Sequence, residues 1–275
     1  MLTLTGFADE ISPDLHVQIE VLESEDIRFI ELRGVWGKNV LQLSDQELSS
    51  LKEELLRKEI QLSSIGSPIG KINILDDFDE HLIQFDRALF AADYFHAKYI
   101  RIFSFFIPDG HNPGAYRDEV ISRLSVLVKK AEQSGIVLLH ENEKEIYGDN
   151  AIRCLDILET INSPYLRMAF DPANFVQCGV KPYSEAYPLL KSYVEYVHIK
   201  DALFESGKVV PAGKGDGEVR ELLQTLKTSG YDGFLSLEPH LAAAETFSGF
   251  SGPDLFKVAA KALKDLLQET ESKWK

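Results

Sequence analysis

The chain has few cysteines, and its basic residues are outnumbered by acidic ones. Only two of its 275 residues are cysteine, Cys154 and Cys178, and neither belongs to a CxxC motif. We therefore expect free thiols in a reducing compartment rather than a disulfide framework. With 29 basic residues against 44 acidic ones, the formal net charge is −15. Such a surface repels phosphate backbones and anionic lipids, so we expect neither a nucleic acid nor a membrane as partner.

Long apolar segments are also lacking. No uninterrupted apolar run approaches the roughly 18 residues that a membrane span requires. The first ten residues contain no basic stretch followed by an apolar block, which is the pattern of a secretory signal. We therefore expect a cytoplasmic protein. Because 44% of its residues are hydrophobic, the chain can still bury a large core.

Short apolar runs are present along the whole chain, and the segments between them have helical periodicity. The strand-like runs cover residues 2–7, 28–32, 61–65, 99–103, 136–140, 166–170, 194–198 and 234–237. An open doubly wound sheet is the rival arrangement, but no GxGxxG motif follows the first run. The repeated alternation without a compositional break predicts an α/β fold, a single (β/α)8 TIM barrel that forms one domain over residues 1–275.

Two of the intervening segments show the kinds of signal that predict the helices. Leu48, Leu51 and Leu55 form an apolar stripe at the spacing of one helix face. Ser12 followed by Pro13 is typical of an N-cap and a first helical position, which predicts a helix that starts there and runs toward Glu25.

Four strand-like runs in the second half of the chain stop at a residue type that binds metals. These residues are Glu141, Asp171, His198 and Glu238, separated by 30, 27 and 40 residues. Each interval is close to one strand-loop-helix-loop unit, and in such barrels the C-terminal ends of the strands carry the chemistry. Taken singly, each carboxylate is more often a helix N-cap or salt-bridge partner, and the histidine a core residue. Their succession at matching strand ends favours a shared metal site.

Three carboxylates and one imidazole suit one divalent cation, Mn²⁺, Mg²⁺, Co²⁺ or Fe²⁺, and Zn²⁺ is also compatible. Such an ion can chelate the carbonyl and adjacent hydroxyl of a sugar and stabilise an enediolate. Glu141 and Glu238 come from the first and last strands of the four, which lets them flank a substrate and transfer its proton. The loops 66–78, 104–114 and 239–252 lie at the same end of the barrel and suit a cap that excludes water.

Further polar residues are expected near these strand ends, each with an ordinary alternative. Arg33 could hold a substrate carboxylate or phosphate, or form a salt bridge at the rim. Trp36 could stack on a sugar or only cover the loop. Lys200 could bind substrate oxygens or pair with a nearby carboxylate. Glu143 could reach the site or cap the next helix.

One motif in the same half of the chain points to a phosphate. The glycine-rich segment 213–217 precedes a predicted helix and could cradle a phosphate group, but it lacks the P-loop pattern, and such turns are common without that role. Asp201, in the loop after Lys200, is expected to orient the site rather than to ligate a metal.

The four segments that contain these residues are similar to those of the xylose-isomerase-like TIM-barrel superfamily of sugar-phosphate isomerases and epimerases. They read LHEN at 139–142, FDPAN at 170–174, VHIKD at 197–201 and SLEP at 236–239. The resemblance extends over essentially the full length. It implies that Glu141, Asp171, His198 and Glu238 are the four metal ligands, with the two glutamates as the acid/base pair.

The chain departs from the superfamily at two positions that bear on its substrate. Many members have histidine where this chain has Glu143, and also where it has Asn174, so either residue could bind substrate or support the ligands. The endonuclease branch of the superfamily uses extra histidines for a three-metal cluster, one of them at the Asn174 position. The asparagine and the acidic charge therefore both argue against nuclease activity.

The sequence thus predicts a divalent-metal-dependent sugar or sugar-phosphate isomerase or epimerase that transfers a proton through a metal-stabilised enediolate. A metal-dependent dehydratase of a cyclic polyol or a dehydroshikimate-type substrate is the second reading. A sugar-binding barrel without catalytic activity is the third. The partner in each case is a small sugar or polyol, and the family analogy leaves a homo-oligomer open.

Overall fold

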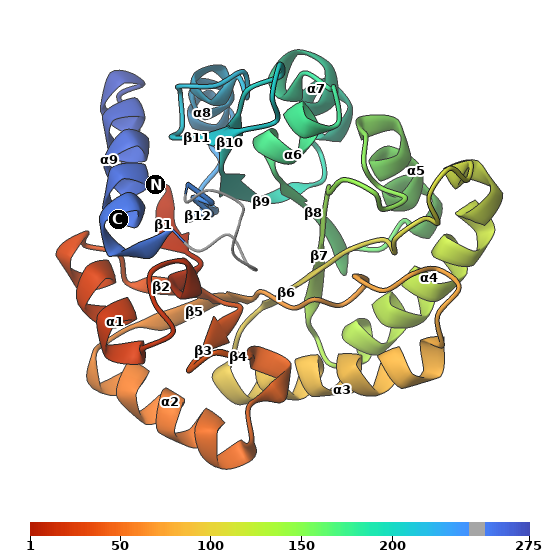
Figure 1. Ribbon diagram of the computed structural model, residues 1–275, viewed down its shortest axis with the longest axis horizontal. Coiled ribbons are helices and arrows are strands. Elements are labelled where there is room, and N and C mark those ends of the chain that lie inside the picture. The colour runs from red at the N-terminus through yellow and green to blue at the C-terminus, as the bar shows by residue number, and fades with distance from the viewer. Residues whose placement is uncertain (242–250) are drawn as a thin grey trace.

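A computed structural model describes residues 1–241 and 251–275 and shows helices arranged around a ring of eight parallel strands (Figure 1). The strands are β1 (Thr3–Gly6), β2 (Phe29–Leu32), β5 (Gln61–Ile65), β6 (Tyr99–Ile102), β7 (Val137–Glu141), β8 (Leu166–Phe170), β9 (Val194–Ile199) and β12 (Phe234–Leu237). They pair in the order β1-β12-β9-β8-β7-β6-β5-β2. No ladder joins β1 to β2 in the described residues, so the barrel is nearly closed, and the predicted TIM-barrel fold is confirmed. That one domain spans the whole chain stays a prediction.

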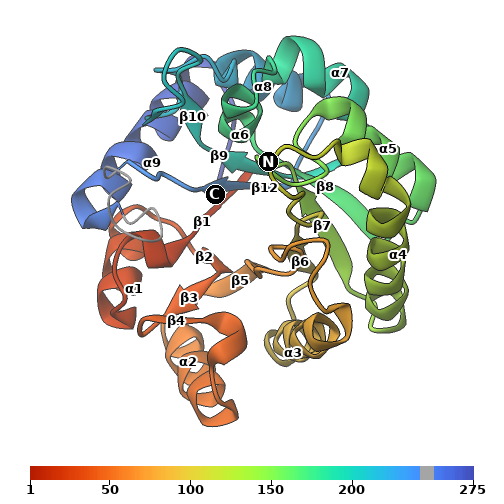
Figure 2. The same ribbon diagram turned by 45° about the vertical axis from the view of Figure 1, so that its right-hand side comes forward.

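In the part of the chain that the structure describes, eight helices pack around the outside of the strands (Figure 2). They are α1 (Leu15–Ser24), α2 (Asp45–Arg57), α3 (Phe78–Phe95), α4 (Arg117–Gln133), α5 (Ala151–Ile161), α7 (Tyr187–Leu190), α8 (Val219–Thr228) and α9 (Gly252–Glu269). The short helix α6 (Pro172–Gln177) and two small hairpins, β3–β4 (Gly34–Val35, Lys38–Asn39) and β10–β11 (Asp201–Ala202, Val209–Val210), follow individual strands. Among the described residues, no helix is both long and apolar enough to cross a bilayer.

Apolar side chains between strands and helices form one large core, as expected when every strand is covered on its outer face. Inside the barrel a second, smaller cluster includes Tyr196, whose hydroxyl lies 2.9 Å from Ser63 Oγ. Parallel ladders join neighbouring strands, and Ser236 of β12 pairs with His198 of β9. Residues at the carboxyl ends of the strands therefore meet at one rim.

The helix starts follow local capping chemistry, although not always where the sequence predicts them. Helix α2 contains the predicted stripe of Leu48, Leu51 and Leu55, and it begins with Ser44 and Glu47 in a capping box. Helix α1 does not begin at Ser12 and Pro13, because Asp14 is its N-cap and accepts hydrogen bonds from two backbone N–H groups. The carbonyl of Pro13 instead accepts the N–H of Trp36, which attaches this segment to the β3–β4 hairpin.

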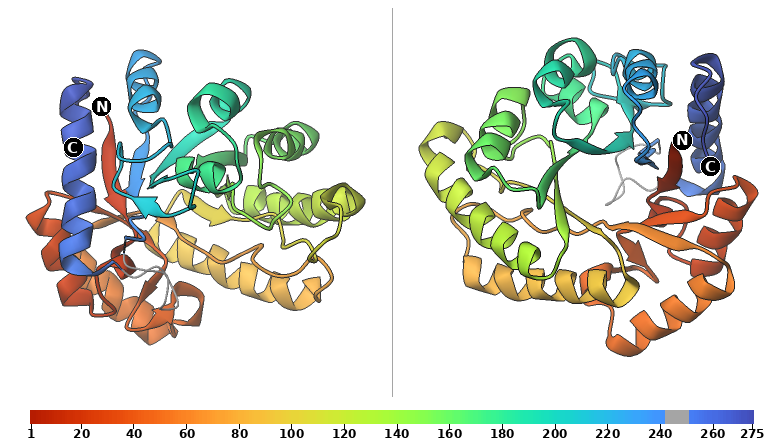
Figure 3. Two further views of the ribbon diagram at one scale, coloured as in Figure 1. Left: turned by 45° about the horizontal axis from the view of Figure 1, so that its top comes forward. Right: turned by 180° about the vertical axis from the view of Figure 1, so that it is seen from behind.

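The segment at the C-terminal end of the chain closes the barrel beside β1. The N–H of Leu4 donates to the carbonyl of Lys275, and Lys275 in turn donates to Leu2. The two ends of the described chain consequently lie side by side next to α9 (Figure 3). These bonds satisfy backbone groups at the start of β1, where it has no ladder to β2.

His81 on α3 makes folding stability dependent on pH. Its Nε2 accepts the N–H of Gly70 at 2.8 Å, and its burial, followed by the charge of Arg123, lowers the pKa of the imidazole to about 4. An unfolded histidine has a pKa of about 6.5, so the contribution to stability is complete above that pH and is lost as the pH falls toward 4. We expect this loss to reach about 3 kcal/mol.

Urea unfolding at pH 7, 5.5 and 4 measures the effect of His81. His81→Gln keeps an acceptor for Gly70 but cannot be protonated, so its stability should fall less steeply with acid than that of the wild type. The same substitution at His16, whose side chain is 73% exposed, provides the matched control. Identical pH profiles for His81→Gln and the wild type would contradict the prediction.

Candidate metal centre

Four buried side chains meet at the carboxyl rim of neighbouring strands. Glu141 is the last residue of β7, Asp171 follows β8 directly, His198 lies near the end of β9, and Glu238 follows β12 directly. Each offers one potential ligand atom, and these four atoms all lie within 4.8 Å of one another. The structure therefore brings together the four residues that the sequence pattern singles out.

His198 presents its Nδ1 atom to the three carboxylates. This atom lies 3.2 Å from Glu141 Oε1 and 3.8 Å from both Asp171 Oδ2 and Glu238 Oε2. Its other nitrogen, Nε2, lies 3.2 Å from an oxygen of Glu31, deeper in the barrel. With its proton on Nε2, the ring donates to this oxygen, and Nδ1 is then the atom available to the cluster.

The charges in the cluster are strongly coupled. Burial raises the pKa of Asp171 to about 6, even though the adjacent Lys200 acts to lower it. Burial would also raise the pKa of Glu141, but the positive charges of His198 and Arg101 outweigh it and lower that pKa to about 2. Burial opposes the charged form of His198 too, yet Glu141 and Glu31 hold its pKa well above the usual value. Without a metal, the cluster therefore favours the ionised form of Glu141 and the protonated form of His198, and an ion that binds Nδ1 would have to displace its proton.

Asp171 serves as both a helix cap and a member of the cluster. Its Oδ1 accepts the N–H of Asn174 at the start of α6, which leaves Oδ2 directed toward the other side chains. The side chain of Asn142 holds the backbone of Asp171 from the other side, donating to its carbonyl at 2.9 Å and accepting its N–H at 3.0 Å. Asp171 can therefore cap the helix with one oxygen and face the cluster with the other.

The donor set fits a divalent ion. Glu141 Oε2, Asp171 Oδ2 and His198 Nδ1 are buried and make no hydrogen bond to the described residues. Two of them have an ion contact instead, Asp171 Oδ2 with Lys200 at 2.8 Å and Glu141 Oε2 with Arg101 at 3.2 Å, which leaves His198 Nδ1 facing the carboxylates without a hydrogen bond. Carboxylate oxygens with one imidazole nitrogen are ligands that bind divalent cations.

Arg33 and Lys200, both singled out by the sequence, are at the cluster and are already paired. Arg33 lies 2.7 Å from Asp9, 2.8 Å from Glu10 and 3.2 Å from Glu238 through its three guanidinium nitrogens. Lys200 Nζ lies 2.8 Å from Asp171 Oδ2 and 2.9 Å from Glu238 Oε2.

The other three predicted substrate-binding residues lie at different distances from the centre. Asn174 is buried, and its amide donates to Glu141 Oε1 at 3.1 Å. Glu143 pairs with Lys71 at 3.1 Å, beside the loop that follows β5. Trp36 occupies the turn of the β3–β4 hairpin, where it is 38% exposed. Only Asn174 of these three therefore contacts one of the four cluster residues in a recorded hydrogen bond.

Two charged residues of the site were missed because they lie within apolar strands rather than at strand ends. Arg101 of β6 is buried, with Nη1 3.2 Å from Glu141 and 3.8 Å from Glu238, so it links the two glutamates. Glu31 of β2 is buried beneath His198 and also accepts a 2.7 Å hydrogen bond from Ser236. A single charge inside a run such as Tyr99-Ile-Arg-Ile is the signal that could have identified each of them.

The glycine-rich segment 213–217 encloses a carboxylate of the chain itself. The N–H groups of Gly213, Gly215 and Gly217 donate to Asp201 at 2.8 to 3.0 Å, and Ala202 adds a fourth at 2.9 Å. A side chain at Gly215 would place its Cβ 2.5 Å from Asp201 Oδ1, so this close wrapping requires glycine. The donors that suggested a phosphate cradle thus fix Asp201, next to Lys200.

The predicted cap is described only in part. Residues 242–250 of the third loop lie outside the described residues. At the start of that loop, His240 Nε2 lies 3.0 Å from Glu10 Oε1 and 3.5 Å from Glu238 Oε1. His240 therefore extends the charged network of Arg33 toward the loop.

Comparison with known proteins identifies the family. The chain belongs to the xylose isomerase-like TIM barrel family, whose model matches residues 19–266. It is 21% identical over 255 residues to a 3-dehydroshikimate dehydratase of Bacillus anthracis, covering 85% of each chain. Its fold resembles a D-tagatose 3-epimerase-like protein (TM-score 0.80, 20% identity, 98% of both chains). It equally resembles the IolI protein with a bound zinc atom (TM-score 0.80, 17% identity, 98% and 99% of the chains).

Proposed function

We propose that the chain is a divalent-metal-dependent isomerase or epimerase that acts on a small sugar or sugar phosphate in the cytoplasm. The observation that supports this most directly is the buried cluster of Glu141, Asp171, His198 and Glu238, whose ligand atoms lie within 4.8 Å of one another. Mn²⁺, Mg²⁺, Co²⁺, Fe²⁺ or Zn²⁺ would suit these donors. The epimerase-like and zinc-containing structural relatives agree with this reading.

The two glutamates are the proposed proton-transfer pair. An ion held by the cluster would supply the Lewis acidity that makes the proton beside a carbonyl group more acidic. The positive groups around Glu141 and Glu238 keep the pKa of each below its usual value, so both are ionised at neutral pH. An ionised carboxylate can take the α-proton, and the resulting acid can return it. For inversion at this carbon, one glutamate would remove the proton, and the other would first take up a proton from solvent and then deliver it to the opposite face.

The remaining polar residues would bind and orient the substrate. Lys200 and Arg33 contribute donors on the side of Glu238, and Arg101 does so between the two glutamates. Asn174 holds an oxygen of Glu141 and so fixes the direction in which that carboxylate points. Trp36 and Glu143, farther out, are proposed to contact the part of the sugar away from the reacting carbon.

A dehydratase is the second candidate, and one observation favours it. The relative from Bacillus anthracis is a dehydratase, and the match covers 85% of both chains. The same proton abstraction would begin the reaction, but a β-hydroxyl group would then leave instead of a proton returning. The same four residues would support either reaction. Whether the proton returns or a hydroxyl group leaves would therefore depend on the substrate.

Deuterium exchange tests the proposal. The protein is stripped with a chelator, reloaded with Mn²⁺, and incubated in D₂O with a panel of ketoses, aldoses and their phosphates. We expect metal-dependent deuterium uptake at one carbon of one sugar pair, observed by NMR. The stripped protein is the control. Cyclic polyols and 3-dehydroshikimate are tested in parallel by the absorbance of a conjugated product.

Each result has a distinct meaning. Exchange together with formation of the isomer or epimer supports the first candidate. Formation of a conjugated product, without conversion of any sugar into its isomer or epimer, supports the dehydratase. If the reloaded protein binds Mn²⁺ and neither reaction takes place with any substrate of the panel, both catalytic proposals are wrong.

A further inference from the structure

The ammonium group of Lys200 contacts the same oxygens that a metal ion would need. It lies 2.8 Å from Asp171 Oδ2 and 2.9 Å from Glu238 Oε2, and the second contact is a hydrogen bond. His198 Nδ1 lies 3.8 Å from each of these two oxygens. The lysine is only 4% exposed, so solvent does little to screen its charge. The ammonium is therefore part of the cluster itself.

The carboxylates of the cluster need a positive charge when no metal is bound. Glu141, Asp171 and Glu238 are buried within a few ångströms of one another, and like charges at that distance disfavour ionisation of all three. Arg101 lies nearest to Glu141, at 3.2 Å. Among the described residues, Lys200 is the cationic side chain within 3 Å of both Asp171 and Glu238. Lys200 therefore supplies the positive charge next to Asp171 Oδ2 and Glu238 Oε2, whereas Arg101 lies nearest to Glu141.

A bound metal ion changes this balance. Oxygen ligands of small divalent ions lie at about 2.0 to 2.2 Å, so the ion would approach the two oxygens more closely than the ammonium does. The ion also carries two positive charges and repels a neighbouring ammonium. We propose that Lys200 substitutes for the metal's charge in the metal-free protein, and that metal binding displaces its ammonium, which then binds an oxygen of the substrate. This inference rests on the proposed metal site.

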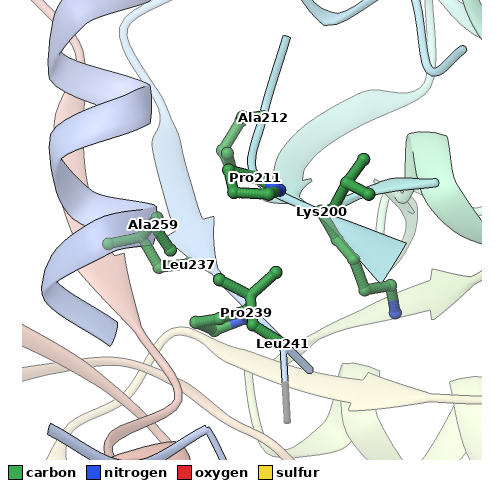
Figure 4. Close-up of a pocket in the computed structure, with 9 residues that line it drawn as sticks. Lys200, Pro211, Ala212, Leu237, Pro239, Leu241 and Ala259 are labelled. Atoms are coloured by element: carbon green, nitrogen blue, oxygen red, sulfur yellow. The ribbon is translucent and has the colours of Figure 1, made fainter. Parts of the chain in front are cut away.

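The rest of the lysine is held so that only its end can move. Its backbone lies between His198, in the β9 ladder, and Asp201, which four backbone N–H groups fix in place. Pro211, Leu237 and Pro239 line a small pocket beside its stem, and Figure 4 shows the nitrogen pointing away from these apolar side chains. A displaced ammonium thus stays near Glu238. Substrate binding through Lys200 would consequently follow metal binding rather than precede it.

Metal titration of charge-free variants tests the inference. Lys200→Gln and Lys200→Met are stripped with a chelator and titrated with Mn²⁺ by calorimetry beside the wild type. We expect both variants to bind Mn²⁺ at least about tenfold more tightly, because the ion no longer has to displace a positive charge. In thermal unfolding the metal-free variants should melt below the metal-free wild type, and saturating Mn²⁺ should remove most of that difference.

Lys71→Gln is the matched control. Lys71 pairs with Glu143 at 3.1 Å and lies over the ring of Phe103, so its removal deletes one positive charge near the site without touching a ligand oxygen. Its Mn²⁺ affinity should change less than about threefold. In the wild type, acetylation of Lys200 by acetic anhydride, measured by peptide mass spectrometry, should increase when Mn²⁺ is bound. This readout does not depend on whether a variant folds.

The outcomes separate this inference from the proposed function. If the wild type binds Mn²⁺ and the Lys200 variants bind it equally or more weakly, the displacement is wrong while the metal site stands. Unchanged acetylation of Lys200 on metal binding also overturns it. If neither the wild type nor the variants bind any of the divalent ions, the proposed function fails and this inference fails with it.

Discussion

Glu238→Gln is expected to stop the interconversion of the two sugars while leaving proton exchange in only one of them. With a base on each face, the enzyme needs both glutamates for net turnover, and general acid–base groups typically contribute factors of about 10² to 10⁴. Turnover should fall by that amount at saturating metal. The sugar whose α-proton faces Glu141 should still exchange with D₂O. Glu141→Gln should show the complementary pattern, with exchange in the other sugar only.

NMR of both sugars in D₂O, at saturating Mn²⁺, measures this pair of variants. Saturation is needed because glutamine is the weaker ligand for a hard cation. Glu195 offers the matched control, because it also lies on a barrel strand but at the opposite end, where it pairs with Lys98 at 3.0 Å. Glu195→Gln should leave turnover unchanged. If both site variants lose exchange in the same sugar, the assignment of one base to each face is incorrect.

Glu31→Gln is expected to weaken divalent-metal binding by about 10- to 100-fold. Glu31 accepts the hydrogen bond that keeps the proton on Nε2 of His198, at 3.2 Å. A glutamine can turn its NH₂ group toward Nε2 and stabilise the tautomer with the proton on Nδ1, the nitrogen that faces the cluster. Metal binding would then have to move the proton from Nδ1 back to Nε2, which weakens the affinity for the ion.

Calorimetric titration with Mn²⁺ measures the effect of Glu31. Ser63→Ala is the control, because Ser63 lies in the same barrel interior and bonds Thr5 and Tyr196. It should change metal affinity by less than about threefold while lowering stability by about 1 kcal/mol. Equal Mn²⁺ affinity of Glu31→Gln and the wild type would show that Glu31 does not prepare His198 for the metal.

The barrel strands were predictable from the sequence because parallel strands covered on both faces read as short apolar runs. Three of them, β5, β8 and β12, begin and end at the predicted residues, and the others differ by one residue at one or both ends. The start of α1 was predicted wrongly, since an N-cap at Ser12 and one at Asp14 are locally similar. Pro13's hydrogen bond to Trp36, a tertiary contact, separates them.

The candidate site was predictable only where the chain order exposes it. Strand ends can be counted from the sequence, so Glu141, Asp171, His198 and Glu238 could be placed at one rim. Arg101 and Glu31 could not be placed in the same way, because each lies inside a short apolar strand rather than at its end. The contact between Asp201 and the glycine-rich segment was unreadable for a similar reason, since a backbone cradle looks alike whether it holds a phosphate or a carboxylate.

The pairing of β1 with β12 has a consequence for how the protein is made. Thr3 lies opposite Phe234, so the first strand emerges from the ribosome 231 residues before its recorded ladder partner. At typical translation speeds of about 5 to 20 residues per second, β1 waits roughly 10 to 50 s with both edges unpaired. The neighbouring strands from β5 to β9 can pair as they appear. Nascent chains stalled before β12 should therefore expose β1 to chaperones and proteases while the middle of the barrel is already protected.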